Sequence, residues 1–288
     1  MSTQGPETFS HNGLTIEFLR IGAGRETILA FHGFGRHAKD FLIFEELLLP
    51  GQQIISFNLF AHGGSIFPAE RLEQQPLTKT EWFDFLSALL TNLDIDKFHM
   101  LGYSMGARVC LATIETMSNR IEEVLLLAPD GLKYNLLYRF ASCTAIGRAI
   151  YSSIIDNPRW LFNLAWLLNK LKILNNKHHR FVHVHLDTRE KRILVHDTWL
   201  IYKRMFPDLS RTAQKMKENG IRMSLIFGVY DSVIPPKLAR RLTEKAEEKT
   251  SLHLIRAGHR LVTPETASFI REKKIWPGNQ PHKPSKRY

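Results

Sequence analysis

The stretch "MLGYSMGARV", residues 100–109, places Ser104 between two glycines, each two positions away from it. An apolar run precedes the serine, and a helical pattern, "MGARVCLATIETM", follows it. Serine is common in turns because its hydroxyl bonds to nearby backbone. A sharp strand-to-helix turn can also hold one side chain up at a sheet edge, with glycines where backbone passes close. The rest of the chain must decide between a structural serine and a chemical one.

Short, nearly continuous apolar runs recur along the chain and predict strands that are buried on both faces. Before them, "HNGLTIEFLRIG" has Asn12-Gly13 followed by alternating Leu14, Ile16 and Phe18, which is typical of a strand in a hairpin. The runs are "ETILAFHGFG", "QQIISFNLFAHGGS", "KFHMLGYSMG", "EEVLLLAPDG", "IRMSLIFGVYDSVIPP" and "TSLHLIRAGH". Helical patterns such as "TKTEWFDFLSALLTNL", with Thr80 as the expected N-cap, lie between them. This alternation predicts a mostly parallel sheet with helices on both faces.

The alternation stops between residues 131 and 210, where helical patterns rich in aromatic residues follow one another. We expect this segment to be a helical cap inserted into an α/β core that comprises residues 1–130 and 211–275. Residues 276–288, "WPGNQPHKPSKRY", are rich in proline and polar residues. They are therefore expected to form a disordered tail.

The composition is that of an ordinary globular protein, with 288 residues, 23% of them charged and 44% hydrophobic. Two cysteines, Cys110 and Cys143, are too few for a disulfide framework. The polar N-terminus has no secretory signal pattern, and no apolar stretch of about 18 residues predicts a membrane-spanning helix. We therefore expect a cytoplasmic location.

The charge is basic and unevenly distributed. The chain has 39 Lys and Arg against 28 Asp and Glu, and residues 131–210 alone hold thirteen of the former and five of the latter. Such an excess attracts an acidic substrate, an anionic membrane or nucleic acid, or else forms a solvated face, which we favour. No nucleic-acid-binding motif accompanies it, so nucleic acid is not an expected partner. Transient contact of the basic cap with a membrane surface stays open.

With the strands placed, Ser104 follows a strand and precedes a helix, as a nucleophile elbow requires. A serine hydroxyl needs a base to activate it and an acid to orient that base. Asp231 and His259 end the last two predicted strands, and functional groups of open parallel sheets gather at such ends. We predict a catalytic triad of Ser104, His259 and Asp231. Asp130 also ends a strand and is the second candidate for the acid.

An oxyanion hole needs two backbone N–H donors. Met105 supplies one, since it follows the nucleophile at a helix N-terminus. Phe34, in the turn "FHGFG", is expected to supply the other, and His32 is expected to hold that turn without transferring protons. The four histidines within 178–185 have no complementary set of cysteines or carboxylates. Neither a metal nor a cofactor is therefore expected.

The motifs "FHGFG", "GYSMG", "GVYDSVIP" and "AGH" together resemble those of the α/β-hydrolase family, in particular its members with a cap after the sixth strand. The resemblance implies an eight-stranded sheet. The serine at the elbow argues against the dehalogenase and epoxide-hydrolase branches, which have an aspartate there. Relatives often have Asp-x-x-Gly-His-Gly-x-Ser after the fourth strand. Here Asn58 and Ala61 replace the aspartate and the first glycine, which questions the hydrogen bonding of that turn.

Two features suggest substrate contacts. Apolar cap residues, Trp166 among them, suggest an apolar acyl pocket, although packing within the fold would explain most of them equally well. Arg108 lies one turn after Ser104 on the same side of the predicted helix. "GYSMGAR" is similar to the "GYSxGGR" of menaquinone-pathway synthases of this fold, in which the matching arginine binds a substrate carboxylate.

The sequence thus predicts a serine hydrolase that cleaves an ester, or a thioester, with an apolar acyl group through an acyl-enzyme. One alternative is carbon–carbon bond hydrolysis or elimination on a carboxylate-bearing substrate by the same triad. Another is a non-catalytic binding protein with the hydrolase fold. The expected partner in the enzyme interpretations is a small-molecule substrate.

Overall fold

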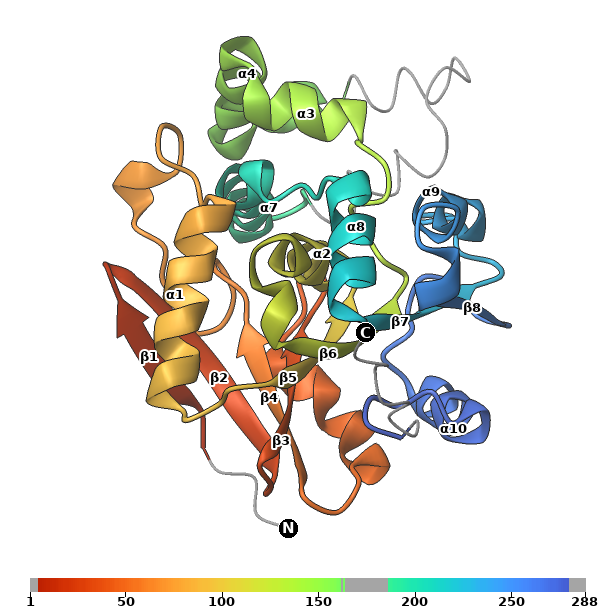
Figure 1. Ribbon diagram of the computed structural model, residues 1–288. Coiled ribbons are helices and arrows are strands. Elements are labelled where there is room, and N and C mark those ends of the chain that lie inside the picture. Colours follow the sequence, from red (N-terminus) through yellow and green to blue (C-terminus); the bar gives the residue numbers. More distant parts are fainter. Residues whose placement is uncertain (1–4, 162, 164–185, 280–288) are drawn as a thin grey trace. The chain divides into compact units, whose positions relative to one another are not determined.

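The computed structural model describes residues 5–161, 163 and 186–279, and within them lies one eight-stranded sheet (Figure 1). Its order is β1-β2-β4-β3-β5-β6-β7-β8, antiparallel between β1, β2 and β4 and parallel elsewhere. The mostly parallel sheet predicted from the alternation is confirmed. The strands are β1 (Glu7–His11), β2 (Leu14–Gly22), β3 (Glu26–Phe31), β4 (Gln52–Asn58), β5 (Phe98–Tyr103), β6 (Ile121–Leu127), β7 (Arg222–Gly228) and β8 (Thr250–Ile255).

The hairpin at one edge of the sheet differs from the central strands. β1 and β2 form the hairpin that Asn12-Gly13 predicts, and both turn residues have positive φ, 49° and 78°. A two-residue turn whose twist matches its strands requires this conformation. β4 and β5 are instead buried at every residue. The continuous apolar runs are therefore central strands covered on both faces.

Helices cover both faces of the sheet (Figure 1). On one face, α2 contacts α1, α8 and the strands β3, β5 and β6. On the other, a ten-residue 3₁₀ helix, Ala38–Leu47, packs against β2, β3 and β4 and contacts α10. The helices that accompany the sheet are α1 (Lys79–Asn92), α2 (Met105–Met117), α8 (Leu209–Asn219), α9 (Arg240–Thr243) and α10 (Pro264–Lys273).

The start of α1 differs from the sequence prediction. Thr78 is the N-cap, and its hydroxyl accepts a hydrogen bond from the Glu81 N–H at 3.1 Å. Thr80, which the sequence analysis chose, already lies inside the helix. In the part of the chain that the structure describes, none of the helices combines the length and the apolar character needed to cross a membrane.

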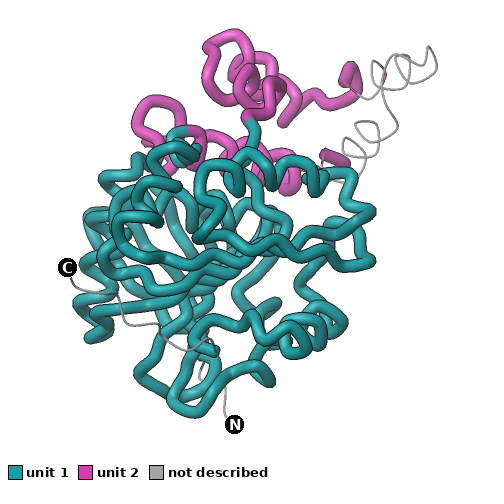
Figure 2. Tube along the Cα trace, turned by 45° about the vertical axis from the view of Figure 1, so that its right-hand side comes forward, with its two compact units in different colours: residues 1–68, 77–133, 204–288 teal, residues 69–76, 134–203 magenta. Residues whose placement is uncertain are grey.

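The chain divides into two compact units (Figure 2). The first contains the sheet and takes its described residues from 1–68, 77–133 and 204–288. The second takes them from 69–76 and 134–203 and contains α3 (Leu136–Cys143), α4 (Ala145–Asp156) and α7 (Arg189–Ile201).

The second unit overlaps the predicted insertion at 131–210 without matching its bounds. Residues 131–133 and 204–210 belong to the first unit. Residues 69–76 join the second unit, where the Lys203 ammonium donates to the Glu73 carbonyl at 2.8 Å. A long-range bond from a side chain to the backbone leaves no pattern in the local sequence.

The predicted disordered tail begins with residues that are part of the fold. Trp276 is buried and packs against Phe44. Its indole N–H donates to Gln52 Oε1, and the Gln52 amide donates to the Pro277 carbonyl, each at 3.0 Å. A buried tryptophan whose N–H is satisfied holds the chain in place, so the prediction is wrong for residues 276–279. Residues 280–288 lie outside the described part of the chain.

Candidate active site

Ser104 lies in a strained turn between β5 and α2. Its backbone has φ 51° and ψ −114°, a conformation that residues with a side chain rarely adopt. The Ser104 N–H donates to the Leu127 carbonyl at 2.9 Å, and the Asp130 N–H donates to the Ser104 carbonyl at 3.1 Å. These bonds tie the turn to the end of β6 and hold the hydroxyl at the carboxyl edge of the sheet.

The glycines around Ser104 are a steric requirement of this turn. A Cβ at Gly106 would lie 1.9 Å from the Phe31 carbonyl oxygen. A Cβ at Gly102 would lie 2.7 Å from the Ala107 Cα. Both distances are far shorter than any van der Waals contact, so α2 approaches β3 and β5 this closely only because these positions have no side chain.

Ser104, His259 and Asp231 form one hydrogen-bonded chain. Ser104 Oγ is 3.0 Å from His259 Nε2, and His259 Nδ1 is 2.7 Å from Asp231 Oδ2. The three residues follow β5, β8 and β7, so the parallel sheet brings them together at one edge. The Asp231 side chain is fully buried, whereas that of His259 is 24% exposed. The carboxylate is therefore shielded from solvent, whereas the imidazole is partly accessible.

The Asp231 carboxylate is oriented by the backbone around it. Oδ1 accepts hydrogen bonds from the Val233 and Ile234 N–H groups, both at 2.8 Å. The same segment is tied to the end of β8, since the Tyr230 N–H donates to the Ala257 carbonyl at 3.0 Å. Oδ2 is thereby directed at the imidazole, which a partner that fixes the histidine tautomer must achieve.

Tyr103 holds the other side of His259, and the sequence analysis did not single it out. Its hydroxyl donates to the His259 carbonyl at 3.1 Å, and the two ring centroids are 5.6 Å apart. Burial raises the pKa of Tyr103 to about 12, so the phenol stays a neutral donor. Only its position directly before Ser104 could have indicated this role.

The two predicted oxyanion donors follow neighbouring strands. Met105 is the first residue of α2, where a helix N–H has no intrahelical partner. Phe34 lies in the turn after β3, which is the neighbour of β5 in the sheet. A Cβ on Gly33 would lie 3.2 Å from Ser104 Cβ, so this turn passes directly beside the serine.

Two buried histidines hold the turn that contains Phe34. His32 Nε2 accepts the Leu59 N–H and His62 Nε2 accepts the Gly35 N–H, each at 3.0 Å. Because these nitrogens must accept, His32 donates from Nδ1 to the Gly33 carbonyl, at 2.7 Å. Burial lowers the pKa of both histidines, and repulsion from His62 lowers that of His32 further. His32 therefore acts on the turn as a neutral hydrogen-bonding group.

The turn after β4 is held by hydrogen bonds of Asn58 despite its unusual sequence. Asn58 Oδ1 accepts the Ala38 N–H at 2.8 Å, and the Asn58 amide donates to the Glu17 carboxylate. An ionised aspartate could accept the first bond but could not donate the second. Ala61 takes the glycine-like conformation, with φ 68°.

Asp130 and Arg108 pair with each other. Arg108 donates from Nε, at 3.0 Å, and from Nη2 to Asp130 Oδ2. Asp130 Oδ1 accepts the Gly131 N–H at 2.7 Å. The buried guanidinium also lies over the Phe206 ring, 5.6 Å from its centroid. Asp130 thus holds Arg108 and not His259, so it does not take the place of Asp231.

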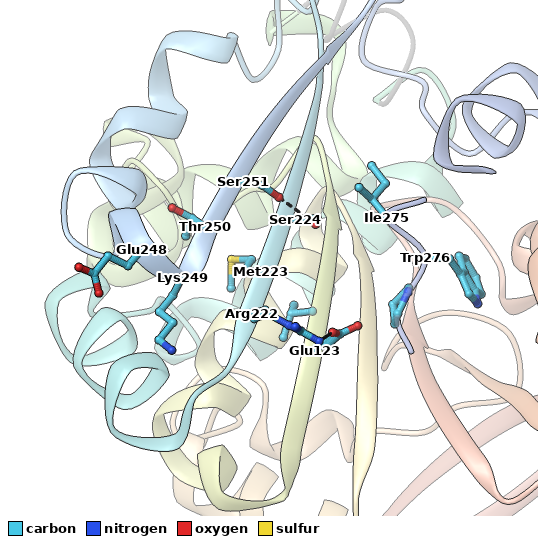
Figure 3. Close-up of a pocket in the computed structure, with 12 residues that line it drawn as sticks. Glu123, Arg222, Met223, Ser224, Glu248, Lys249, Thr250, Ser251, Ile275 and Trp276 are labelled. Carbon is cyan, nitrogen blue, oxygen red and sulfur yellow. Dashed lines mark hydrogen bonds and ion pairs between the residues drawn. The ribbon is translucent and has the colours of Figure 1, made fainter. Parts of the chain in front are cut away.

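The remaining candidate features do not adjoin Ser104 in the described part of the structure. The hollow in Figure 3 is lined by the first residues of β7 and β8 together with Trp276, at the edge of the sheet opposite to Ser104. Trp166 and the histidines within 178–185 lie outside the described residues. Among the residues that are described, no three His, Cys, Asp or Glu side chains converge as a metal site requires.

Among known proteins, the relatives that the chain matches are longer than the chain itself. The dihydrolipoyllysine-residue acetyltransferase component of the acetoin cleaving system of Pseudomonas putida is 29% identical over 128 residues, which are 44% of this chain and 33% of that protein. Protein PHYLLO, chloroplastic, of Arabidopsis thaliana is 26% identical over 262 residues, 86% of this chain and 14% of that protein. The chain thus spans a third or less of the length of these relatives.

The fold is shared more completely. A thermophilic esterase from Thermogutta terrifontis superimposes with a TM-score of 0.61 at 17% identity, over 95% of this chain and 98% of that one. At this identity the likeness establishes the fold alone. The model of the alpha/beta hydrolase fold family matches residues 26–190, more than half of the chain. With the strand order and the elbow at Ser104, this match shows that the chain belongs to the α/β-hydrolase fold family.

Proposed function

We propose that the protein hydrolyses carboxylic esters with an apolar acyl group, with Ser104 as the nucleophile. The main support is the hydrogen-bonded chain from Ser104 through His259 to Asp231, with distances of 3.0 and 2.7 Å. Both distances are within the reach that proton transfer and orientation require. Thioesters would be cleaved by the same chemistry.

In this proposal Ser104 Oγ attacks the acyl carbon while His259 Nε2 takes its proton. The Nδ1–H of His259 stays bonded to Asp231, whose negative charge stabilises the imidazolium. The N–H groups of Met105 and Phe34 donate to the developing oxyanion. His259 then gives its proton to the leaving alcohol, which leaves an acyl-enzyme. Water activated by His259 releases the carboxylic acid and restores Ser104.

Exposed apolar side chains next to Asp231 support an apolar acyl group. Val229, Tyr230 and Val233 are all exposed. Apolar side chains grouped at the edge of a candidate site are typical of a ligand-binding surface. A contact between Trp166 and the substrate remains a prediction, since that residue lies outside the described part of the chain.

The arrangement of Arg108 disfavours the alternative of a carboxylate-bearing substrate. Asp130 already accepts two of its hydrogen bonds, so a substrate carboxylate would have to displace an existing ion pair. The non-catalytic alternative is disfavoured by Ser104 itself. A binding protein does not need a strained serine aligned with a buried aspartate–histidine pair.

A fluorophosphonate probe tests the nucleophile. Purified wild-type protein should be labelled, and Ser104→Ala should not, because the probe reacts with an activated serine hydroxyl. Ser224→Ala is the matched control, since the Ser224 hydroxyl bonds to that of Ser251, at 3.0 Å, and lies at the opposite edge of the sheet. Label that persists in Ser104→Ala, or no label on the wild type, would contradict the proposal. Esters and thioesters of graded acyl length would then rank the substrates.

A further inference from the structure

Exposed apolar side chains concentrate in one part of the second unit. Seven of the fourteen large apolar side chains that are exposed among the described residues lie between residues 134 and 160. Leu136 is 78% exposed and Ile146 is 70% exposed. A cluster of exposed apolar side chains is typical of an interaction surface, whereas apolar residues exposed singly need no explanation.

The buried faces of α3 and α4 pack inside the unit. The Tyr138 hydroxyl, from α3, donates to the Trp199 carbonyl of α7 at 3.2 Å. The Tyr151 hydroxyl, from α4, donates to the Arg192 carbonyl of α7 at 3.4 Å. α7 therefore occupies one side of both helices (Figure 1).

The other side of both helices is apolar and exposed. Leu136 and Phe140 on α3, and Ile146 and Ile150 on α4, are spaced four residues apart, so each pair lies on one side of its helix. The two helices pack closely where they meet, because a Cβ at Gly147 would lie 2.0 Å from the Phe140 carbonyl oxygen. Leu136, Leu137, Phe140, Ile146 and Ile150 are called the α3–α4 apolar face below.

Between residues 136 and 155, α3 and α4 contribute two arginines, Arg139 and Arg148, and no aspartate or glutamate. Arg148 pairs with Glu73 of the same unit, at 3.9 Å, so Arg139 is the cation on which the docking proposed below depends. Arg139 is exposed and directly precedes Phe140 in α3. A helix with an exposed apolar side and adjacent cations is typical of proteins that lie at a lipid interface.

We propose that the α3–α4 apolar face docks on an anionic lipid surface. The aliphatic and aromatic side chains enter the boundary between headgroups and acyl chains, and Arg139 approaches the anionic headgroups. A second copy of the chain fits less well, because a two-fold contact through this face would bring its own cations together. This docking does not depend on the proposed ester hydrolysis.

Vesicle cosedimentation of the full chain tests the docking. Wild-type protein should bind vesicles of mixed phosphatidylglycerol and phosphatidylcholine more strongly than vesicles of phosphatidylcholine alone. The double variant Leu136→Glu/Ile146→Glu should bind the anionic vesicles roughly tenfold more weakly or worse. Both positions are in the first turn of their helices. A carboxylate there is stabilised by the helix dipole, so folding should be retained. Circular dichroism and thermal unfolding would check this.

Two single variants sharpen the result. Ile66→Glu removes an isoleucine that is 59% exposed in the first unit, and it should bind vesicles as the wild type does. Arg139→Gln should weaken binding to anionic vesicles by about fivefold, since one cation near the surface contributes about 1 kcal/mol.

The same experiments can overturn the proposal. Equal binding of the wild type and the double variant would do so, as would no preference for anionic vesicles. A dimer that the double variant abolishes, without vesicle binding, would assign the face to a second copy. Hydrolysis of a water-soluble ester should be unchanged in the double variant, so failure of the docking and failure of the proposed hydrolysis are separate results.

Discussion

Asp231 and Asp130 follow the neighbouring strands β7 and β6 at the same edge of the sheet, yet they have different partners. Asp231 is fully buried, and its oxygens accept from His259 Nδ1 and from two backbone N–H groups. The Asp130 side chain is 28% exposed and accepts from the Arg108 guanidinium. Both aspartates lie just after the carboxyl end of a strand, so that position alone does not distinguish them.

The difference lies in what each partner can do with a proton. An imidazole can lose and gain one under physiological conditions. A guanidinium stays charged. The Asp231–His259 pair can therefore take part in a proton transfer, whereas the Asp130–Arg108 pair is a fixed ion pair that ties the end of β6 to α2. The partner, and not the strand end, distinguishes a candidate catalytic carboxylate from a structural one.

The largest expected effect is that of Asp231→Asn on turnover. The amide keeps the shape of the carboxylate but removes its charge and favours the wrong tautomer of His259. The kcat for a neutral ester should fall by about 10⁴-fold, with KM nearly unchanged. Steady-state kinetics with a chromogenic ester would measure both constants.

Asp130→Asn is the matched change at the other carboxylate. It should lower kcat by less than about threefold, because Asp130 is not bonded to the imidazole. If Asp130→Asn caused the large loss and Asp231→Asn the small one, the comparison between the two carboxylates would be reversed.

The second prediction concerns the stability of the fixed pair. Arg108→Ala leaves Asp130 without its charged donor and removes the contact with Phe206. The free energy of unfolding should fall by about 1–3 kcal/mol, as measured by urea denaturation. Arg108→Lys keeps the charge but not the two hydrogen bonds of the guanidinium. Its free energy of unfolding should therefore fall less than that of Arg108→Ala.

The kinetics of Arg108→Ala sharpen the same comparison. For a neutral ester, kcat/KM should change little if Arg108 only holds Asp130. A fall of about 10- to 150-fold that is confined to carboxylate-bearing substrates, with unchanged stability, would instead mean that Arg108 binds the substrate. That outcome would return the carbon–carbon cleavage or elimination alternative to first place.

The sequence predicted those parts of the molecule in which few residue types are allowed. Gly102 and Gly106 are needed because backbone passes where a Cβ would be. The sheet was predictable because buried parallel strands need continuous apolar runs. The family resemblance rested on these restricted positions and is confirmed. The grouping of Ser104, His259 and Asp231 was also anticipated, since all three follow strands of one parallel sheet.

The remaining features depend on contacts that leave no local pattern. The burial of Trp276 depends on Gln52, 224 positions earlier, while its own neighbours are proline, glycine and polar residues. The pairing of Arg108 with Asp130 depends on side-chain direction, which helical spacing alone does not determine. Tyr103 acts through its hydroxyl on the backbone of His259, 156 positions later. Each case needs the fold before the partner can be named.

The smallest expected effect concerns histidines whose protons do not move. His32 and His62 accept backbone N–H groups in the folded protein, and burial lowers the pKa of both below the ordinary value of 6.5. The nearby His37 lowers both further, and Arg36 acts on His32. They differ in this from His259, which needs to exchange its proton with Ser104 in the proposed mechanism.

The sign of the pH dependence follows from where protons bind. Below about pH 6.5 the unfolded chain takes up protons on these histidines and the folded chain does not, so stability should fall with falling pH. Each histidine contributes at most about 1.4 kcal/mol per pH unit. His62→Gln keeps an acceptor for the Gly35 N–H but cannot titrate, so its unfolding free energy should depend less steeply on pH between 7 and 5. Urea denaturation of both proteins across this range measures the difference. Identical slopes would mean that His62 is protonated in the folded protein, and its bond to Gly35 could not then exist as the structure has it.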